Sequence, residues 1–337
     1  MKRGKIRKII IAAVTVGVVL SSFVGCGQKQ EKEGTSTKET SNKKLNIAIQ
    51  PVIGFLPLYI MKDDKTLEKA LSDAGYQVDV TYTEYESGPP ENEAFAAGLA
   101  DVGVIGNVPA LSAIASGQDR KLIGIAYNGE KTQAIIVPKD SEIKKVSDLK
   151  GKKIGLVVGS IAQNFVSAVF EKEQLEFQDV QFVNLSAGEQ QQALETKQVD
   201  AVATWEPTIS KLTSDGKNTI LADGTGVFLG ENPIIARGKY VESNPEIVQI
   251  FLDEYKKTVE KLKADQDTYA EKYSKYFGLD KSIVQAALTK VNPKITIDEE
   301  DVTDLQKTAE FLKKQNLIST DIKVNDYVDD SFGKKLK

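Results

Sequence analysis

Glycine-containing turns mark the points where apolar, strand-like segments change into helix-like ones, and they constrain the fold more than any other feature. Two of these turns lie within residues 85–110, at Ser87-Gly88-Pro89-Pro90 and Gly106-Asn107-Val108-Pro109, and a third spans 158–161. The first turn of a helix has backbone N–H groups without intrahelical acceptors and the positive end of the helix dipole. Three such turns therefore predict a pocket for a small, polar, anionic ligand.

Strand-like and helix-like segments alternate along most of the chain, which predicts α/β lobes with parallel strands covered by helices on both faces. In such sheets, ligands bind beyond the carboxyl ends of the strands, where the three turns are also expected. The first unit has expected strands at 45–50, 78–85, 101–105 and 122–127, with helices at 56–74, 91–97 and 108–116. The second has expected strands at 153–158, 180–185, 201–204 and 219–221, with helices at 162–173 and 189–197.

Two further strand-like segments, Gln133–Pro138 and Pro233–Arg237, are interpreted as strands at which the chain crosses between the units. From residue 245 the chain is almost entirely helix-like, with apolar residues at three- and four-residue spacing. We therefore predict two α/β lobes joined by two crossing strands, with a helical C-terminal region. The first lobe is expected to comprise residues 44–138 and 233–337, and the second residues 139–232.

The N-terminus has the pattern of an export signal, because a basic segment precedes an apolar run from Ile9 to Val24. Phe23-Val24-Gly25-Cys26 resembles the lipobox of bacterial lipoprotein precursors. This resemblance implies a signal peptide at 1–25, lipidation of Cys26, and a location on the extracytoplasmic face of the cell membrane. The alternative is a plain anchor with an incidental cysteine. Residues 26–43 are polar and are expected to form a flexible tether.

Composition excludes several classes of function. Removal of residues 1–25 removes five cations and no acids, which takes the formal net charge from −4 to −9, so nucleic acid is not an expected partner. The chain has no histidine, and its only cysteine is the expected lipid site. Disulfides, thiolate metal sites and Ser–His or Cys–His pairs are therefore excluded. We expect no metal, no cofactor and no catalytic residues.

Side chains at other strand ends are candidates for the pocket. Trp205 is either a core residue or a pocket wall, and its place after the strand-like segment 201–204 favours a wall that packs on an apolar ligand tail. Glu206 either binds an ammonium group or caps a turn. Tyr127 either lines the cleft or ends a sheet. Arg237 is interpreted as a surface or lobe-bridging charge rather than as an anion ligand.

The turn motifs together resemble those of the solute-binding proteins of ABC importers for aliphatic sulfonates, nitrate and taurine. The resemblance covers residues 45–260, includes the Asp-Val-Gly at 101–103 and the segment 199–207, and is closest to the sulfonate branch at 87–90. It implies a periplasmic-binding-protein type II fold with ligand between the lobes. With the strand-end candidates, the expected ligand-binding residues are Ser87, Gly88, Asn107, Tyr127, Ser160, Trp205 and Glu206.

The resemblance implies that the chain is the monomeric, lipid-anchored solute-binding component of an ABC importer, which delivers an aliphatic sulfonate to a membrane permease. The alternatives within this class are taurine, nitrate and a thiamine-pyrimidine precursor. Taurine needs an acid near its ammonium group, and Glu206 is the candidate. An enzyme is disfavoured, because a related fold that makes a pyrimidine consumes a histidine of its own chain, and this chain has none.

Overall fold

The computed structural model describes residues 43–336. The expected signal peptide, Cys26 and residues 27–42 of the tether lie outside the described residues. The first strand already begins at Lys43, the last residue assigned to the tether. Within 43–336, no helix is both long enough and apolar enough to cross a membrane.

The first sheet has six strands in the order β11-β4-β10-β3-β1-β2. β1 pairs in parallel with β2 and β3, whereas β10 lies between β3 and β4 and is antiparallel to both. The strands are β1 (Lys43–Ile49), β2 (Val78–Glu84), β3 (Val102–Val104), β4 (Arg120–Asn128), β10 (Asn232–Arg237) and β11 (Asn292–Ile295).

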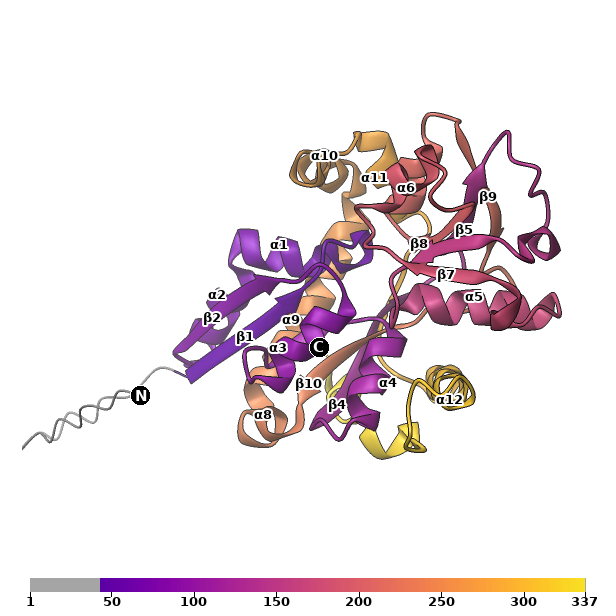
Figure 1. Cartoon of the computed structure of the whole chain (residues 1–337). Coiled ribbons are helices and arrows are strands. Elements are labelled where there is room, and N and C mark those ends of the chain that lie inside the picture. The colour runs from indigo at the N-terminus through magenta and orange to yellow at the C-terminus, as the bar shows by residue number, and fades with distance from the viewer. Residues whose placement is uncertain (1–42, 337) are drawn as a thin grey trace, which may run out of the picture. The chain divides into compact units, whose positions relative to one another are not determined.

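The second sheet has five strands in the order β7-β6-β8-β5-β9. β6 is parallel to β7 and β8, whereas β5 is antiparallel to β8 and β9. The strands are β5 (Gln133–Pro138), β6 (Lys153–Leu156), β7 (Gln181–Asn184), β8 (Ala201–Trp205) and β9 (Asn218–Asp223). The two sheets confirm the two-lobe α/β organisation (Figure 1).

The crossing strands explain why neither sheet is wholly parallel. The other strands, apart from edge strand β11, run in one direction in each sheet, but β5 and β10 enter from the opposite lobe and run against them. Both are buried along almost their whole length, as expected for interior strands. Because β5 belongs to the second sheet, the chain leaves the first sheet after Asn128, and the division expected at residue 138 comes ten residues earlier.

Helices cover both sheets. They are α1 (Leu56–Asp64), α2 (Thr66–Asp73), α3 (Gly88–Ala96), α4 (Asn107–Ala115), α5 (Ile161–Lys172), α6 (Gln190–Glu195), α7 (Thr208–Thr213), α8 (Gly238–Ser243), α9 (Pro245–Ala264), α10 (Gln266–Phe277), α11 (Lys281–Leu288) and α12 (Glu299–Lys314). Short 3₁₀ helices lie at Ile53–Phe55, Val146–Leu149, Phe177–Asp179, Val324–Tyr327 and Gly333–Lys335. The single helix expected at 56–74 is two helices, because Lys65 adopts a left-handed conformation with φ 51°.

The C-terminal region is helical apart from β11, which extends the first sheet beside β4. Its long helix α9 packs on α1 and α2, and its apolar face is buried at Ile247, Phe251 and Tyr255. α12 packs on α4 and also contacts α5 of the second lobe (Figure 1). The C-terminal helices therefore belong to the first lobe but reach the second.

Candidate functional site

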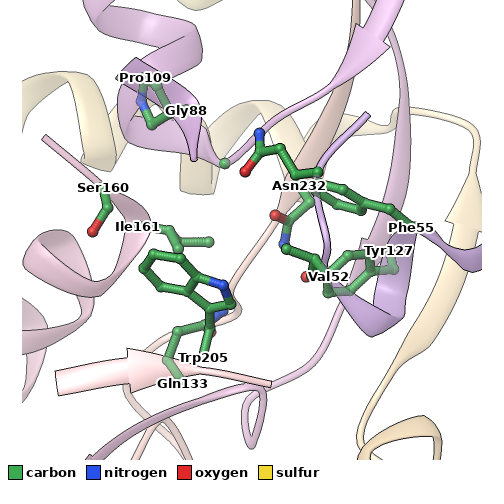
Figure 2. Close-up of a pocket in the computed structure, with 12 residues that line it drawn as sticks. Val52, Phe55, Gly88, Pro109, Tyr127, Gln133, Ser160, Ile161, Trp205 and Asn232 are labelled. Carbon is green, nitrogen blue, oxygen red and sulfur yellow. The ribbon is translucent and has the colours of Figure 1, made fainter. Parts of the chain in front are cut away.

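A cavity of about 20 Å³ lies between the two lobes, where strands of both sheets meet the helices that follow them (Figure 2). A space of this size holds roughly one water molecule. None of the side chains that line it carries a charge. The lining residues are Gln50, Val52, Phe55, Gly88, Gly106, Pro109, Tyr127, Gln133, Ser160, Ile161, Trp205 and Asn232.

Three helix N-termini converge on this cavity. Gly88 begins α3, Gly106 is the N-cap of α4, and Ser160 is the N-cap of α5, so two helices come from the first lobe and one from the second. In none of the three helices does a backbone N–H group donate a hydrogen bond to the N-cap side chain. The ends of α4 and α5 are close, since a Cβ added at Gly106 would lie 3.1 Å from Ile161 Cβ. The three glycine turns of the sequence therefore meet at one place, which is favourable for an anion.

Two of the expected side chains at the helix ends do not line the cavity. Asn107 is fully buried, accepts a hydrogen bond from Val108 N (2.8 Å) and donates one to Thr308 Oγ1 (3.2 Å). Ser87 precedes α3 but is not among the lining residues. Ser160 lines the cavity, although its hydroxyl group donates to the carbonyl oxygen of Val157 at 2.7 Å. Backbone groups rather than these hydroxyl and amide side chains therefore dominate the helix ends.

The first residue of each crossing strand supplies an amide side chain that the sequence did not indicate. Gln133 begins β5 and Asn232 begins β10, and both line the cavity (Figure 2). Gln133 Oε1 lies 3.0 Å from Thr132 Oγ1, whose single proton has a nearer acceptor in the carbonyl oxygen of Gly129 at 2.7 Å. Its Nε2 is buried and has no partner among the described residues. A buried donor without an acceptor is costly, so Gln133 Nε2 is a strong candidate for a ligand contact.

A buried acid lies directly behind the cavity wall. Gln50 lines the cavity and donates from Nε2 to Glu91 Oε2 at 2.5 Å, while Glu91 Oε1 has no partner among the described residues. Burial raises the pKa of Glu91 to about 8, although the hydrogen bond from Gln50 and the positive charge of Arg120 act in the opposite direction. Glu91 is therefore mostly protonated at neutral pH and adds little negative charge beside the helix ends.

Aromatic rings form the apolar part of the wall. Trp205 ends β8 and is 7% exposed, and its ring projects toward Ile161 (Figure 2). Tyr127 packs against Phe55 with ring centroids 5.7 Å apart, and it leaves no room for a side chain at Gly54. Burial, and to a lesser degree the charge of Glu206, raises the pKa of Tyr127, so its hydroxyl group stays neutral. Both strand-end aromatic residues therefore lie at the cavity.

The two charged residues considered in the sequence, Glu206 and Arg237, each form an ion pair with a residue of opposite charge. Glu206 is 2% exposed, forms an ion pair with Lys290, and accepts hydrogen bonds from Ser210 N (3.2 Å) and Ser210 Oγ (3.0 Å). It therefore caps the start of α7 and does not line the cavity. Arg237 pairs with Asp101 within the first lobe, so it neither bridges the lobes nor reaches the cavity.

Trp205 lines this cavity and also a larger groove. The groove has a volume of about 310 Å³, and residues from both lobes line it. Leu212, Phe277 and Leu279 give it apolar surface, and the charged residues Glu86 and Lys211 also line it. Within residues 43–336, no group of acidic or cysteine side chains is arranged to hold a metal ion.

The chain is similar in sequence and in structure to known proteins. Residues 73–269 match the family model described as NMT1/THI5 like. The chain belongs to the NMT1/THI5-like family. Among its relatives is a putative aliphatic sulfonates-binding protein of Bacillus subtilis, which is 33% identical over 99% of this chain and 97% of its own length. A putative aliphatic sulfonates-binding protein of Escherichia coli is 26% identical over 83% of this chain and 86% of its own length.

One solved structure has the same fold as this member of the NMT1/THI5-like family over most of the length of both chains. It is the alkanesulfonate-binding protein SsuA from Xanthomonas axonopodis pv. citri bound to MOPS. It is 27% identical, has a TM-score of 0.78, and covers 85% of this chain and 98% of its own. The likeness supports the type II fold expected from the sequence.

Proposed function

We propose that this protein is the extracytoplasmic solute-binding component of an ABC importer, and that it binds an aliphatic sulfonate between its lobes. The single observation that carries the proposal is the convergence of three helix N-termini and the unpaired Gln133 amide on one uncharged cavity. The relatives and the solved structure described above, which are named as sulfonate-binding proteins, support the same ligand class.

The head group is expected to sit among Gly88, Gly106 and Ile161, with Gln133 Nε2 as a side-chain donor. A sulfonate is a permanent anion at physiological pH, and hydrogen bonds to a charged acceptor are stronger than neutral ones. Dipoles and N–H groups can therefore hold it without a lysine or arginine in the cavity. A cavity of about 20 Å³ is too small for this group, so the lobes must move apart before a ligand enters.

The organic tail is expected to pass Trp205 into the groove of about 310 Å³. The Trp205 ring and the apolar groove residues Leu212, Phe277 and Leu279 favour an aliphatic substituent. Nitrate has no tail to use this groove. Taurine needs a free acid near its ammonium group, but Glu206 is paired with Lys290. A thiamine-pyrimidine precursor lacks the sulfonate for which the helix ends are suited. These observations favour an alkanesulfonate over the three alternatives.

The proposed location and partners are those expected of a solute-binding component of an ABC importer. We propose that lipidation of Cys26 anchors a monomer to the extracytoplasmic face of the membrane, and that the ligand-closed form docks on a permease while a separate ATPase supplies energy. The chain is expected to release its ligand unchanged. A turnover assay on bound ethanesulfonate checks this, because any product would indicate an enzyme.

Isothermal titration calorimetry of the full-length chain in detergent tests the ligand. The panel comprises ethanesulfonate, longer alkanesulfonates, taurine, nitrate and a thiamine-pyrimidine precursor. We expect a dissociation constant in the micromolar range or below for ethanesulfonate, and tighter binding as the chain lengthens. Absence of heat across all sulfonates would remove the assignment and leave the fold unaffected.

A further inference from the structure

Thr308 of the C-terminal helix α12 is hydrogen-bonded to both lobes at once. Its Oγ1 accepts from Asn107 Nδ2 at 3.2 Å and from Asn164 Nδ2 at 2.9 Å, and it donates to the carbonyl oxygen of Asp304 at 3.3 Å. Asn107 belongs to α4 of the first lobe and Asn164 to α5 of the second. The three side chains of this group are 0–5% exposed, so water does not replace these bonds.

The two asparagines lie close to the candidate site along the chain. Asn107 directly follows Gly106, and Asn164 lies one helical turn beyond the cavity residue Ile161. The group therefore connects the two helix ends that face each other across the cavity.

α12 is packed mainly against the first lobe. Its residues Leu305, Ala309 and Leu312 share a buried cluster with Val108 and Leu111 of α4, so α12 and α4 form one packed unit. Its contact with the second lobe is narrower (Figure 1). That contact includes the bond to Asn164 and an edge-on contact of the Phe311 and Phe177 rings, whose centroids are 5.9 Å apart.

The hydrogen bonds from Asn107 and Asn164 to Thr308 depend differently on the positions of the two lobes. The bond from Asn107 joins parts of the same lobe and persists when the lobes separate. The bond from Asn164 crosses between lobes and can form only when they are together. We propose that Thr308 is a positioning residue whose hydroxyl group, with Asn107 and Asn164, forms an interlobe latch that stabilises the closed form and thereby slows release of the ligand.

The latch rests on the proposed function in one respect only: the rate of ethanesulfonate dissociation can be measured only if the chain binds this ligand. Thr308→Val keeps the shape of the side chain but removes the acceptor, and it leaves the buried Asn164 amide unpaired in the closed form only. We expect ethanesulfonate to dissociate between about five-fold and about one-hundred-fold faster, with little change in the association rate. Thr308→Ser keeps the hydroxyl group and is expected to restore the wild-type rates. Thr303→Val, at an exposed position of the same helix, is the matched control.

The chain contains one tryptophan, Trp205, which lines the cavity and reports on closure. Stopped-flow fluorescence of the full-length chain in detergent gives both rate constants. Acrylamide quenching of the ligand-free chain gives a second readout that needs no ligand. We expect quenching to increase in Thr308→Val and to remain at the wild-type level in Thr308→Ser and Thr303→Val.

Wild-type dissociation and quenching in a folded Thr308→Val variant would overturn the latch, as would a Thr308→Ser variant as impaired as Thr308→Val. If Thr308→Val does not fold, Asn164→Ala decides, because it removes the interlobe donor and leaves the first lobe intact. Wild-type kinetics in Asn164→Ala would also overturn the latch. If the wild type binds no sulfonate, the proposed function fails, but quenching still decides for or against the latch.

Discussion

Gln50 Nε2 donates a hydrogen bond to the buried carboxyl group of Glu91 at 2.5 Å, which connects the wall of the cavity to a group that titrates near physiological pH. Ionisation of Glu91 places a negative charge directly behind the expected anion site. The candidate site therefore has a pH dependence of its own, independent of the ligand, because a sulfonate does not titrate in this range.

Anion affinity is expected to decrease as pH rises through about 8, the pKa of Glu91. The decrease is expected to be on the order of ten-fold, because a repulsion of about 1.4 kcal/mol between like charges in a medium with an effective dielectric constant of about 20 changes the affinity by that factor. Glu91→Gln keeps the shape and a hydrogen-bond acceptor for Gln50 but cannot ionise. Calorimetry between pH 6 and 9, chosen to bracket about 8, is expected to give a flat profile for the variant, and equal slopes for both proteins would contradict the argument.

The same group links folding stability to pH. The folded chain keeps the Glu91 proton up to about pH 8, whereas the unfolded chain loses it near the ordinary value of 4.5. The unfolded state binds fewer protons between these values, so the free energy of unfolding decreases there as pH rises, by at most about 1.4 kcal/mol per pH unit. Urea titrations of wild type and Glu91→Gln check this, because their difference is expected to change only inside that window.

Gln133 is expected to contribute to binding and not to stability. Gln133→Leu removes the unpaired Nε2 donor and is expected to weaken ethanesulfonate binding roughly ten-fold to one-hundred-fold. Gln133→Glu is expected to abolish binding, because it places a carboxylate against the anion. Thermal unfolding is expected to be unchanged or slightly improved in Gln133→Leu. Gln181→Leu, at an exposed position of β7, serves as the control, and equal binding by both leucine variants would exclude the contact.

Gly106→Ala is expected to impair closure selectively. Gly106 has φ −66°, which alanine adopts freely, but the added Cβ would lie 3.1 Å from Ile161 Cβ of the other lobe. We expect several-fold weaker binding with unchanged thermal stability. The double variant Gly106→Ala/Ile161→Gly removes the contacted Cβ atom and is expected to recover part of the affinity. A purely local effect on α4 would leave the double variant no better than the single one.

The Glu206–Lys290 pair is expected to matter for folding rather than for ligand choice. Lys290→Met leaves a carboxylate that is 2% exposed without its cation, at a cost of about 3–5 kcal/mol in urea unfolding. Glu206→Gln is expected to cost less, because Lys290 keeps partial access to solvent. The ratio of taurine to ethanesulfonate affinity is expected to stay constant in Glu206→Gln. A selective loss of taurine binding would show that Glu206 contacts the ligand after all.

Local sequence signals were sufficient for the lobes and for the helix ends. Gly88 and Ser160 follow a strand and lie at the start of a helix, Trp205 ends a strand before a helix, and the carboxyl ends of parallel strands in one sheet share an edge. Their placement at one cavity therefore follows from the alternation of strands and helices. Tyr127, near the end of β4, also lines the cavity, and its role as a ligand contact stays a prediction.

The parts of the site that were missed depend on contacts between distant segments. Gln133 and Asn232 reach the cavity because the crossing strands begin at the interface, and this requires knowledge of which sheet each strand joins. Neighbouring sequence did not reveal the partner of Glu206, 84 residues away, or that of Asn107, 201 residues away. A polar side chain at a strand end was therefore a weaker indication of a ligand-binding residue than a glycine turn, because a residue far away in the sequence can form a hydrogen bond or ion pair with that side chain.

The position of Gln133 and Asn232 at the first residues of the two crossing strands has a consequence for how a guest is captured. Rotation of one half of the protein about these strands is expected to displace Gln133 and Asn232 less than the ends of α3, α4 and α5. A guest can therefore be held by the two amides first, while the protein is still open, and be enclosed by the helix ends afterwards. Recognition by the two side-chain amides and enclosure by the helix ends then become separate steps.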